Sequence, residues 1–170
     1  MSDLDHDCDD PGAPPLTRAE TLVLWAIRAW VAGHRHDLAV LPNLRTAFRN
    51  EGAPAAAEAV DDLMAHIGHG AGRTIQVNCP RCRQVTDDER LLMDVIALHQ
   101  EGETQWAPFL VRAILTPEAT RASAPLFEAL ARALSHGGIL LPTVTGPESR
   151  TGETPVGMGA HVMPPGATIH

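Results

Sequence analysis

The segment 17–33 constrains the fold most strongly, because it holds a complete helix together with its start and stop signals. Thr17 and Glu20 are spaced as in a capping box, in which each side chain binds the backbone N–H of the other residue. A nearly continuous apolar run follows, and Gly33 closes it. We predict a helix over 17–32. Because this helix is apolar on nearly every face, we expect it in the middle of a helical bundle.

Apolar residues at spacings of three and four recur along the rest of the chain and predict further helices. Thr86 and Glu89 form a second capping-box pair, and Pro54 and Pro117 stand where proline favours the first turn of a helix. The predicted segments are 43–50, a helix that begins at Pro54 and is ended by Gly68, Gly70 and Gly72, 86–100, a helix marked by Trp106, Phe109, Leu110 and Ile114, and 117–135. The sequence therefore predicts an all-α fold, a small bundle of five or six helices with short connections.

Residues 73–78 are the one segment with a strand-like pattern, since Ile75 and Val77 alternate with polar neighbours. One strand cannot form a sheet. The segment therefore either pairs with a second short extended piece or is only an extended connector.

Composition divides the chain into a leader, a core and a tail. Residues 1–16 carry five Asp and neither Arg nor Lys, and residues 137–170 contain seven Gly and five Pro. Such segments bury too little apolar surface to fold. We predict a disordered acidic leader at 1–16, a helical domain at 17–141 and a disordered Gly/Pro-rich tail at 142–170.

Charge and hydropathy exclude several classes of protein. The formal charge is -8, without the basic excess that nucleic-acid binding requires, so no nucleic-acid partner is expected. The longest apolar stretch, 22–33, is interrupted by Arg28 and is shorter than the roughly 20 residues of a membrane span. The N-terminus has no secretory pattern, so we predict a cytoplasmic protein. Three cysteines, an odd number, argue against a disulfide framework.

The motif that could bind a metal ion or take part in a reaction is Cys79-Pro-Arg-Cys82. Two residues between cysteines let both thiolates bind one ion from a tight turn, as in the knuckle of a structural zinc site. His66 and His69 lie three apart at the end of a predicted helix and project from nearly the same side. Asp62, one turn before His66, could fix the tautomer of that imidazole. The sequence therefore predicts a Zn²⁺ ion held by Cys79, Cys82, His66 and His69.

Other histidines could replace either predicted ligand. His34 and His36 alternate in a polar loop after the first helix, and His99 continues an apolar stripe of its helix. The interpretation we favour for His99 is a core imidazole bound to a backbone carbonyl. Arg28, inside the first helix, is expected to reach the surface or to pair with an acid. Acids at 87–89 are explained by the dipole at a helix start.

Four protein ligands leave no position for water, so the predicted zinc is structural. The leading functional prediction is an interaction or regulatory module with a protein partner, and not an enzyme. The alternative is a thiol-redox or metal-dependent enzyme that uses Cys79 and Cys82, because a strand leading into Cys-Pro-x-Cys and then a helix is a layout of dithiol enzymes. Against this alternative, the predicted helix begins four residues past Cys82, and alternating strands are missing elsewhere.

Overall fold

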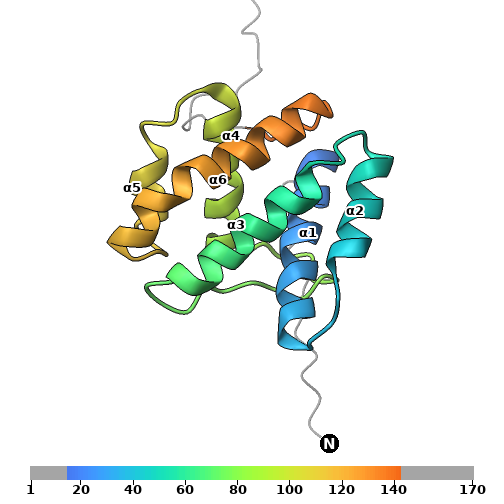
Figure 1. The fold of residues 1–170 in the computed structure, drawn as a ribbon, viewed down its shortest axis with the longest axis horizontal. Coiled ribbons are helices and arrows are strands. Elements are labelled where there is room, and N and C mark those ends of the chain that lie inside the picture. Colours follow the sequence, from blue (N-terminus) through green and yellow to red (C-terminus); the bar gives the residue numbers. More distant parts are fainter. Residues whose placement is uncertain (1–14, 143–170) are drawn as a thin grey trace, which may run out of the picture.

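The computed structural model describes residues 15–142. Within that range the chain forms six helices and no strand (Figure 1). Their bounds are α1 Arg18–Arg35, α2 Leu41–Asn50, α3 Ala56–Gly70, α4 Asp87–Glu101, α5 Ala107–Val111 and α6 Pro117–His136. The prediction of a small all-α bundle is confirmed.

The predicted leader at 1–16 and tail at 142–170 fall almost entirely outside the described residues, so both stay predictions. The described residues include all of the predicted helical domain at 17–141. Among their helices, none has the length and apolar character needed to cross a membrane.

Both predicted capping boxes are present, at the N-termini of α1 and α4. At α1, the Thr17 hydroxyl accepts a hydrogen bond from the Glu20 N–H at 3.2 Å, and the Thr17 N–H donates to the Glu20 carboxylate at 2.8 Å. At α4, Thr86 and Glu89 make the same exchange at 3.1 and 2.9 Å. Each box satisfies N–H groups that a helix start leaves unpaired, which explains why these two helices begin as predicted.

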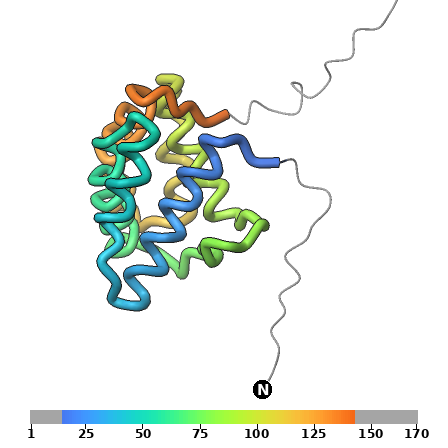
Figure 2. The backbone as a smooth tube through the Cα atoms, turned by 90° about the vertical axis from the view of Figure 1, so that its right-hand side faces the viewer, coloured from blue at the N-terminus to red at the C-terminus, as the bar shows by residue number. Residues whose placement is uncertain are grey.

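The helix α3 lies at the centre of the packing, with α6 on one side and α1 and α2 on the other (Figure 1). We predicted this central place for α1, and that prediction is wrong, because α1 packs beside α3 and α4. The connector between α3 and α4 also runs beside α1 (Figure 2), which explains why α1 is apolar on more faces than the one that meets α3 and α4. Phe48 of α2 and Phe127 of α6 are fully buried in the shared core.

Of the glycines expected to end the third helix, Gly68 lies within α3, which runs to Gly70. Gly70 lies directly against Ala119 of α6, and a Cβ at Gly70 would lie 2.3 Å from the Ala119 Cβ. Glycine therefore permits the close approach of the two helices at this point. The chain leaves α3 through an isolated bridge between Ala71 and Leu115.

The region around α5 differs from its prediction. Trp106 and Phe109 are 57% and 67% exposed, although the pattern grouped them with Ile114, which is buried. The helix is only five residues long and buries Ala107 and Val111. A single turn this short cannot turn every apolar residue of the segment towards the core, so two aromatic side chains remain at the surface.

Residues 73–78 form no strand within the described part of the chain and act as a connector. Their backbone is bound by side chains instead of by a second strand. The N–H of Gln76 donates to Asp88 at 2.8 Å, and the N–H of Asn78 donates to Glu89 at 2.9 Å. Of the two possibilities that the sequence left open, pairing with a second strand is therefore wrong.

Candidate functional site

A buried ion pair joins α1 to the start of α4. The Arg28 Nε and Nη2 atoms lie 2.7 and 2.8 Å from the two carboxylate oxygens of Glu89. Arg28 is 3% exposed and Glu89 is fully buried. Two parallel charge-assisted hydrogen bonds make this the strongest geometry available to an Arg–carboxylate pair. The prediction that Arg28 pairs with an acid is confirmed.

The same pair binds the connector that carries the two cysteines. Arg28 donates to the backbone carbonyl of Cys82 and, at 2.6 Å, to that of Gln84. Glu89 accepts from the N–H groups of Asn78 and Thr86, both at 2.9 Å. Among the described residues, no buried side-chain nitrogen or oxygen lacks a hydrogen-bond partner. The connector is therefore held on both sides of the cysteine turn by one satisfied polar network, which we call the Arg28–Glu89 clamp.

A second carboxylate fixes the first part of the connector. Asp88 receives two hydrogen bonds from the Arg73 guanidinium, at 2.8 and 2.5 Å, and one from the Gln76 N–H. The bonds from Arg73 hold the pKa of the Asp88 carboxyl below its usual value, although burial opposes them. Arg73 also donates to the carbonyl of Ala113 at 2.9 Å, which ties the connector to the segment after α5.

Cys79 and Cys82 lie in the tight turn that their spacing predicts. The Cys82 N–H donates to the Cys79 carbonyl at 3.1 Å. Cys79 is exposed and Cys82 is half-buried, and Pro80 and Arg81 between them are exposed. Figure 2 shows that the connector stands out to one side of the helices. The turn is therefore presented to solvent on a fixed base.

The two predicted histidine ligands lie against backbone carbonyls and are not grouped with both cysteines. The Nε2 atom of His66 lies 2.9 Å from the carbonyl of Ala119 in α6, and the Nδ1 atom of His69 lies 2.6 Å from the carbonyl of Ala65. Across residues 15–142, no three or more side chains of His, Cys, Asp or Glu are grouped so as to hold an ion. The four predicted ligands are thus not brought together, and zinc binding stays a prediction.

The alternative histidines are also engaged in other contacts. His34 stacks on Trp30 with ring centroids 5.1 Å apart, and His36 is the C-cap of α1. The Nδ1 atom of His99 lies 2.8 Å from the Val95 carbonyl, and its ring stacks on Phe127. The expected bond of His99 to a backbone carbonyl is confirmed, and the residue is half-buried.

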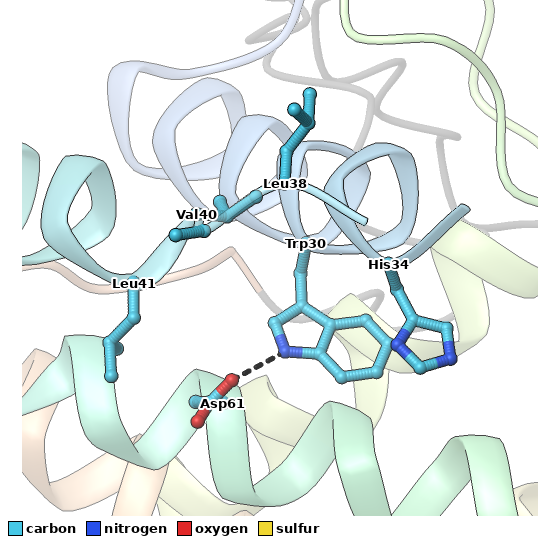
Figure 3. Close-up of a pocket in the computed structure, with 7 residues that line it drawn as sticks. Trp30, His34, Leu38, Val40, Leu41 and Asp61 are labelled. Carbon is cyan, nitrogen blue, oxygen red and sulfur yellow. Dashed lines mark hydrogen bonds between the residues drawn. The ribbon is translucent and has the colours of Figure 1, made fainter. Parts of the chain in front are cut away.

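A pocket of about 250 Å³ opens between α1, α3 and the turn that follows α1 (Figure 3). The Trp30 indole N–H donates to the Asp61 carboxylate across this pocket at 2.7 Å. The side chains of Leu38, Val40 and Leu41 line its other wall. The pocket is lined by polar as well as apolar groups, with Asp61 as its carboxylate, and none of the predicted ligands Cys79, Cys82, His66 and His69 lines it.

The residues that the sequence reasoning missed are Asp88 and Glu89. We assigned them to the dipole and cap of α4, whereas each also binds the connector and an arginine. The available signal was Arg28, a cation inside an otherwise apolar helix, which needs a buried acid as partner. Nothing in the spacing shows which acid, because Arg28 and Glu89 are 61 residues apart.

Comparison with known proteins gives no match: no family model, curated protein or solved structure resembles this chain significantly. The function therefore has to be argued from the side chains and their geometry.

Proposed function

We propose that this chain is a metal-dependent protein interaction module in which Cys79 and Cys82 bind Zn²⁺. The observation that carries the proposal is that a solvent-facing turn with two cysteines is fixed by a fully satisfied, buried ion pair. Thiolates are preferred zinc ligands, and a reducing compartment such as the cytoplasm keeps them available.

The energetics of the clamp support a positioning role. A buried ion pair contributes little net stability, because desolvation offsets most of the attraction, and apolar side chains of similar volume often serve better. In this chain the pair also binds the backbone of the connector, because Arg28 donates to the carbonyl of Cys82 and Glu89 accepts from the N–H of Asn78. Holding a ligand pair in its binding geometry before the ion arrives increases affinity, because less conformational entropy is lost on binding.

The local structure favours zinc over dithiol redox chemistry. Dithiol enzymes place the reactive cysteine at the N-terminus of a helix, where the dipole stabilises a thiolate. In this chain α4 begins at Asp87, five residues after Cys82. Neither cysteine lies in the first turn of a helix, so that source of activation is missing from the turn.

The proposal is tested by the metal content of the full-length protein, purified with a reductant and without chelators. We expect tightly held zinc in the wild type and its loss in Cys79→Ser. The matched control is Cys8→Ser, which removes the remaining cysteine of the chain and should keep the metal. Metal-free wild type that alkylates rapidly at Cys79 would contradict the proposal and support redox chemistry.

The same measurement decides the role of the predicted histidines. Loss of zinc in a His66→Ala/His69→Ala variant that stays helical would show that both rings leave their carbonyl partners to bind the ion. Retention of zinc in that variant would leave Cys79 and Cys82 as ligands and would exclude the two histidines.

A further inference from the structure

We propose that the zinc ion bound by Cys79 and Cys82 is completed by the same two cysteines of a second copy of this chain, so that a Cys₄ site joins two chains. This inference rests on the proposed function, because it names the protein partner of that same site.

The first argument is the shortage of ligands within one chain. Structural zinc in proteins is bound tetrahedrally by four protein ligands. The turn supplies two of them, and the residues 15–142 bring no third His, Cys, Asp or Glu into a group with them. The rings of His66 and His69, the predicted candidates, lie against backbone carbonyls. The other two zinc ligands must therefore be side chains that are not grouped with Cys79 and Cys82 within residues 15–142 of the same chain.

The second argument is symmetry and access. Homodimers with a twofold axis use the same surface patch on both copies. Two copies of this turn supply four sulfur ligands, which fills the tetrahedron with one ligand type. The connector stands out from the helices (Figure 2), and Cys79, Pro80 and Arg81 within it are exposed. Two copies can therefore meet through their turns.

The third argument is charge. Four thiolates outweigh one divalent ion, so a Cys₄ site carries excess negative charge. Arg81 lies between the cysteines and Arg83 follows them, and both are exposed. Each copy adds the exposed Arg81 between its two cysteines, and this positive charge offsets part of the excess. The local charge thus complements the site, although the chain as a whole is acidic.

The binding step is an exchange of protons for metal. Each of the four thiols gives up its proton, the sulfurs coordinate Zn²⁺, and no sulfur is oxidised. Dimerisation should therefore need no oxidant.

The experiment is a measurement of molar mass by light scattering during gel filtration, with reductant present, on the full-length chain with Zn²⁺ and with EDTA. We expect 18.2 kDa in EDTA and twice that mass with zinc, with one ion for two chains. Cys79→Ser should stay monomeric with zinc, while Cys8→Ser should dimerise like the wild type. Circular dichroism checks that Cys79→Ser keeps its helices.

The outcomes separate this inference from the proposed function. A monomer that binds one zinc ion per chain overturns the shared site and leaves the proposed function standing, with the histidines or other residues of the same chain as ligands. A chain that binds no zinc overturns both. A dimer that persists in EDTA, or in Cys79→Ser, overturns the zinc-dependent dimer.

Discussion

Arg28 of α1 and Glu89 of α4 form a bidentate ion pair in the interior of the bundle, and Glu89 is also the third residue of its own helix, where it completes the capping box with the N-cap Thr86. One carboxylate therefore closes a capping box, neutralises a buried guanidinium and binds the N–H of Asn78. Helix initiation, helix packing and the course of the connector depend on the same side chain.

The first prediction concerns the charge of Glu89. Glu89→Gln leaves the Arg28 guanidinium buried without its counter-ion, which should lower the free energy of unfolding by about 3–5 kcal/mol. Urea unfolding followed by circular dichroism measures this change. The matched control is Glu128→Gln, which breaks an exposed ion pair with Arg132 and should cost at most about 0.5 kcal/mol. Similar values for the two variants would contradict the buried clamp.

The second prediction concerns acid. Hydrogen bonds from Arg73 lower the pKa of Asp88 in the folded state, so the folded protein binds this proton less readily than the unfolded chain. The stabilisation is therefore present above the unfolded pKa, which is about 4, and is lost as the pH falls below it. Unfolding free energies of wild type and Asp88→Asn should differ at about pH 6 and converge as the pH falls from the unfolded pKa through the lower pKa of the folded state. Parallel pH profiles would show that Asp88 does not carry this effect.

The third prediction concerns Asp94, whose carboxyl should lower the stability of the fold as the pH rises, the opposite of the effect of Asp88. Burial raises the pKa of this half-buried carboxyl to about 6, with Arg90 opposing the shift and Glu20 adding to it. Because the folded state favours the protonated form, stability falls as the pH rises from about 4 to about 6. Asp94→Asn should therefore stabilise the protein at neutral pH by about 1 kcal/mol, after allowance for solvent screening, and should have little effect at about pH 4. A destabilised Asp94→Asn protein at neutral pH would contradict this account.

The fourth prediction compares two glycines of α3. Gly70→Ala places a methyl group against Ala119 of α6 and should destabilise the protein by about 1–3 kcal/mol. Gly68→Ala meets only Trp30, at 4.0 Å, and should gain about 0.5–1 kcal/mol from the better helix propensity of alanine. Thermal unfolding measures both. Equal effects of the two substitutions would mean that α3 and α6 are not in close contact at Gly70.

Local signals in the sequence were enough for the fold class and for two helix starts. Thr17 and Thr86 carry capping information within four residues, so the helices α1 and α4 begin as predicted. The length of α3 and the exposure of Trp106 depend on neighbours far away in the chain. The residue at position 70 lies against Ala119, which leaves no room for a Cβ, and a helix with the length of α5 buries only part of its apolar stripe.

In the candidate site, too, the sequence predicts the local features but not the long-range contacts. The Cys79–Cys82 turn follows from the spacing of the two cysteines, and the structure contains it. The partners of His66 and the clamp from Arg28 are contacts across 53 and 61 residues, which no local pattern encodes. Spacing could place two histidines on one side of a helix, but only the packing of α3 on α6 decides what that side faces.

The central claim is that the Arg28–Glu89 clamp holds the cysteine turn ready for Zn²⁺. The most direct test is the zinc dissociation constant of Arg28→Met/Glu89→Leu, in which apolar side chains replace the ion pair, with circular dichroism to check that the helices are kept. Competition with a chelator should show affinity about 10–100-fold weaker than in the wild type, as expected when a supporting contact of a metal ligand is lost. Unchanged zinc affinity in a folded double variant would contradict the claim.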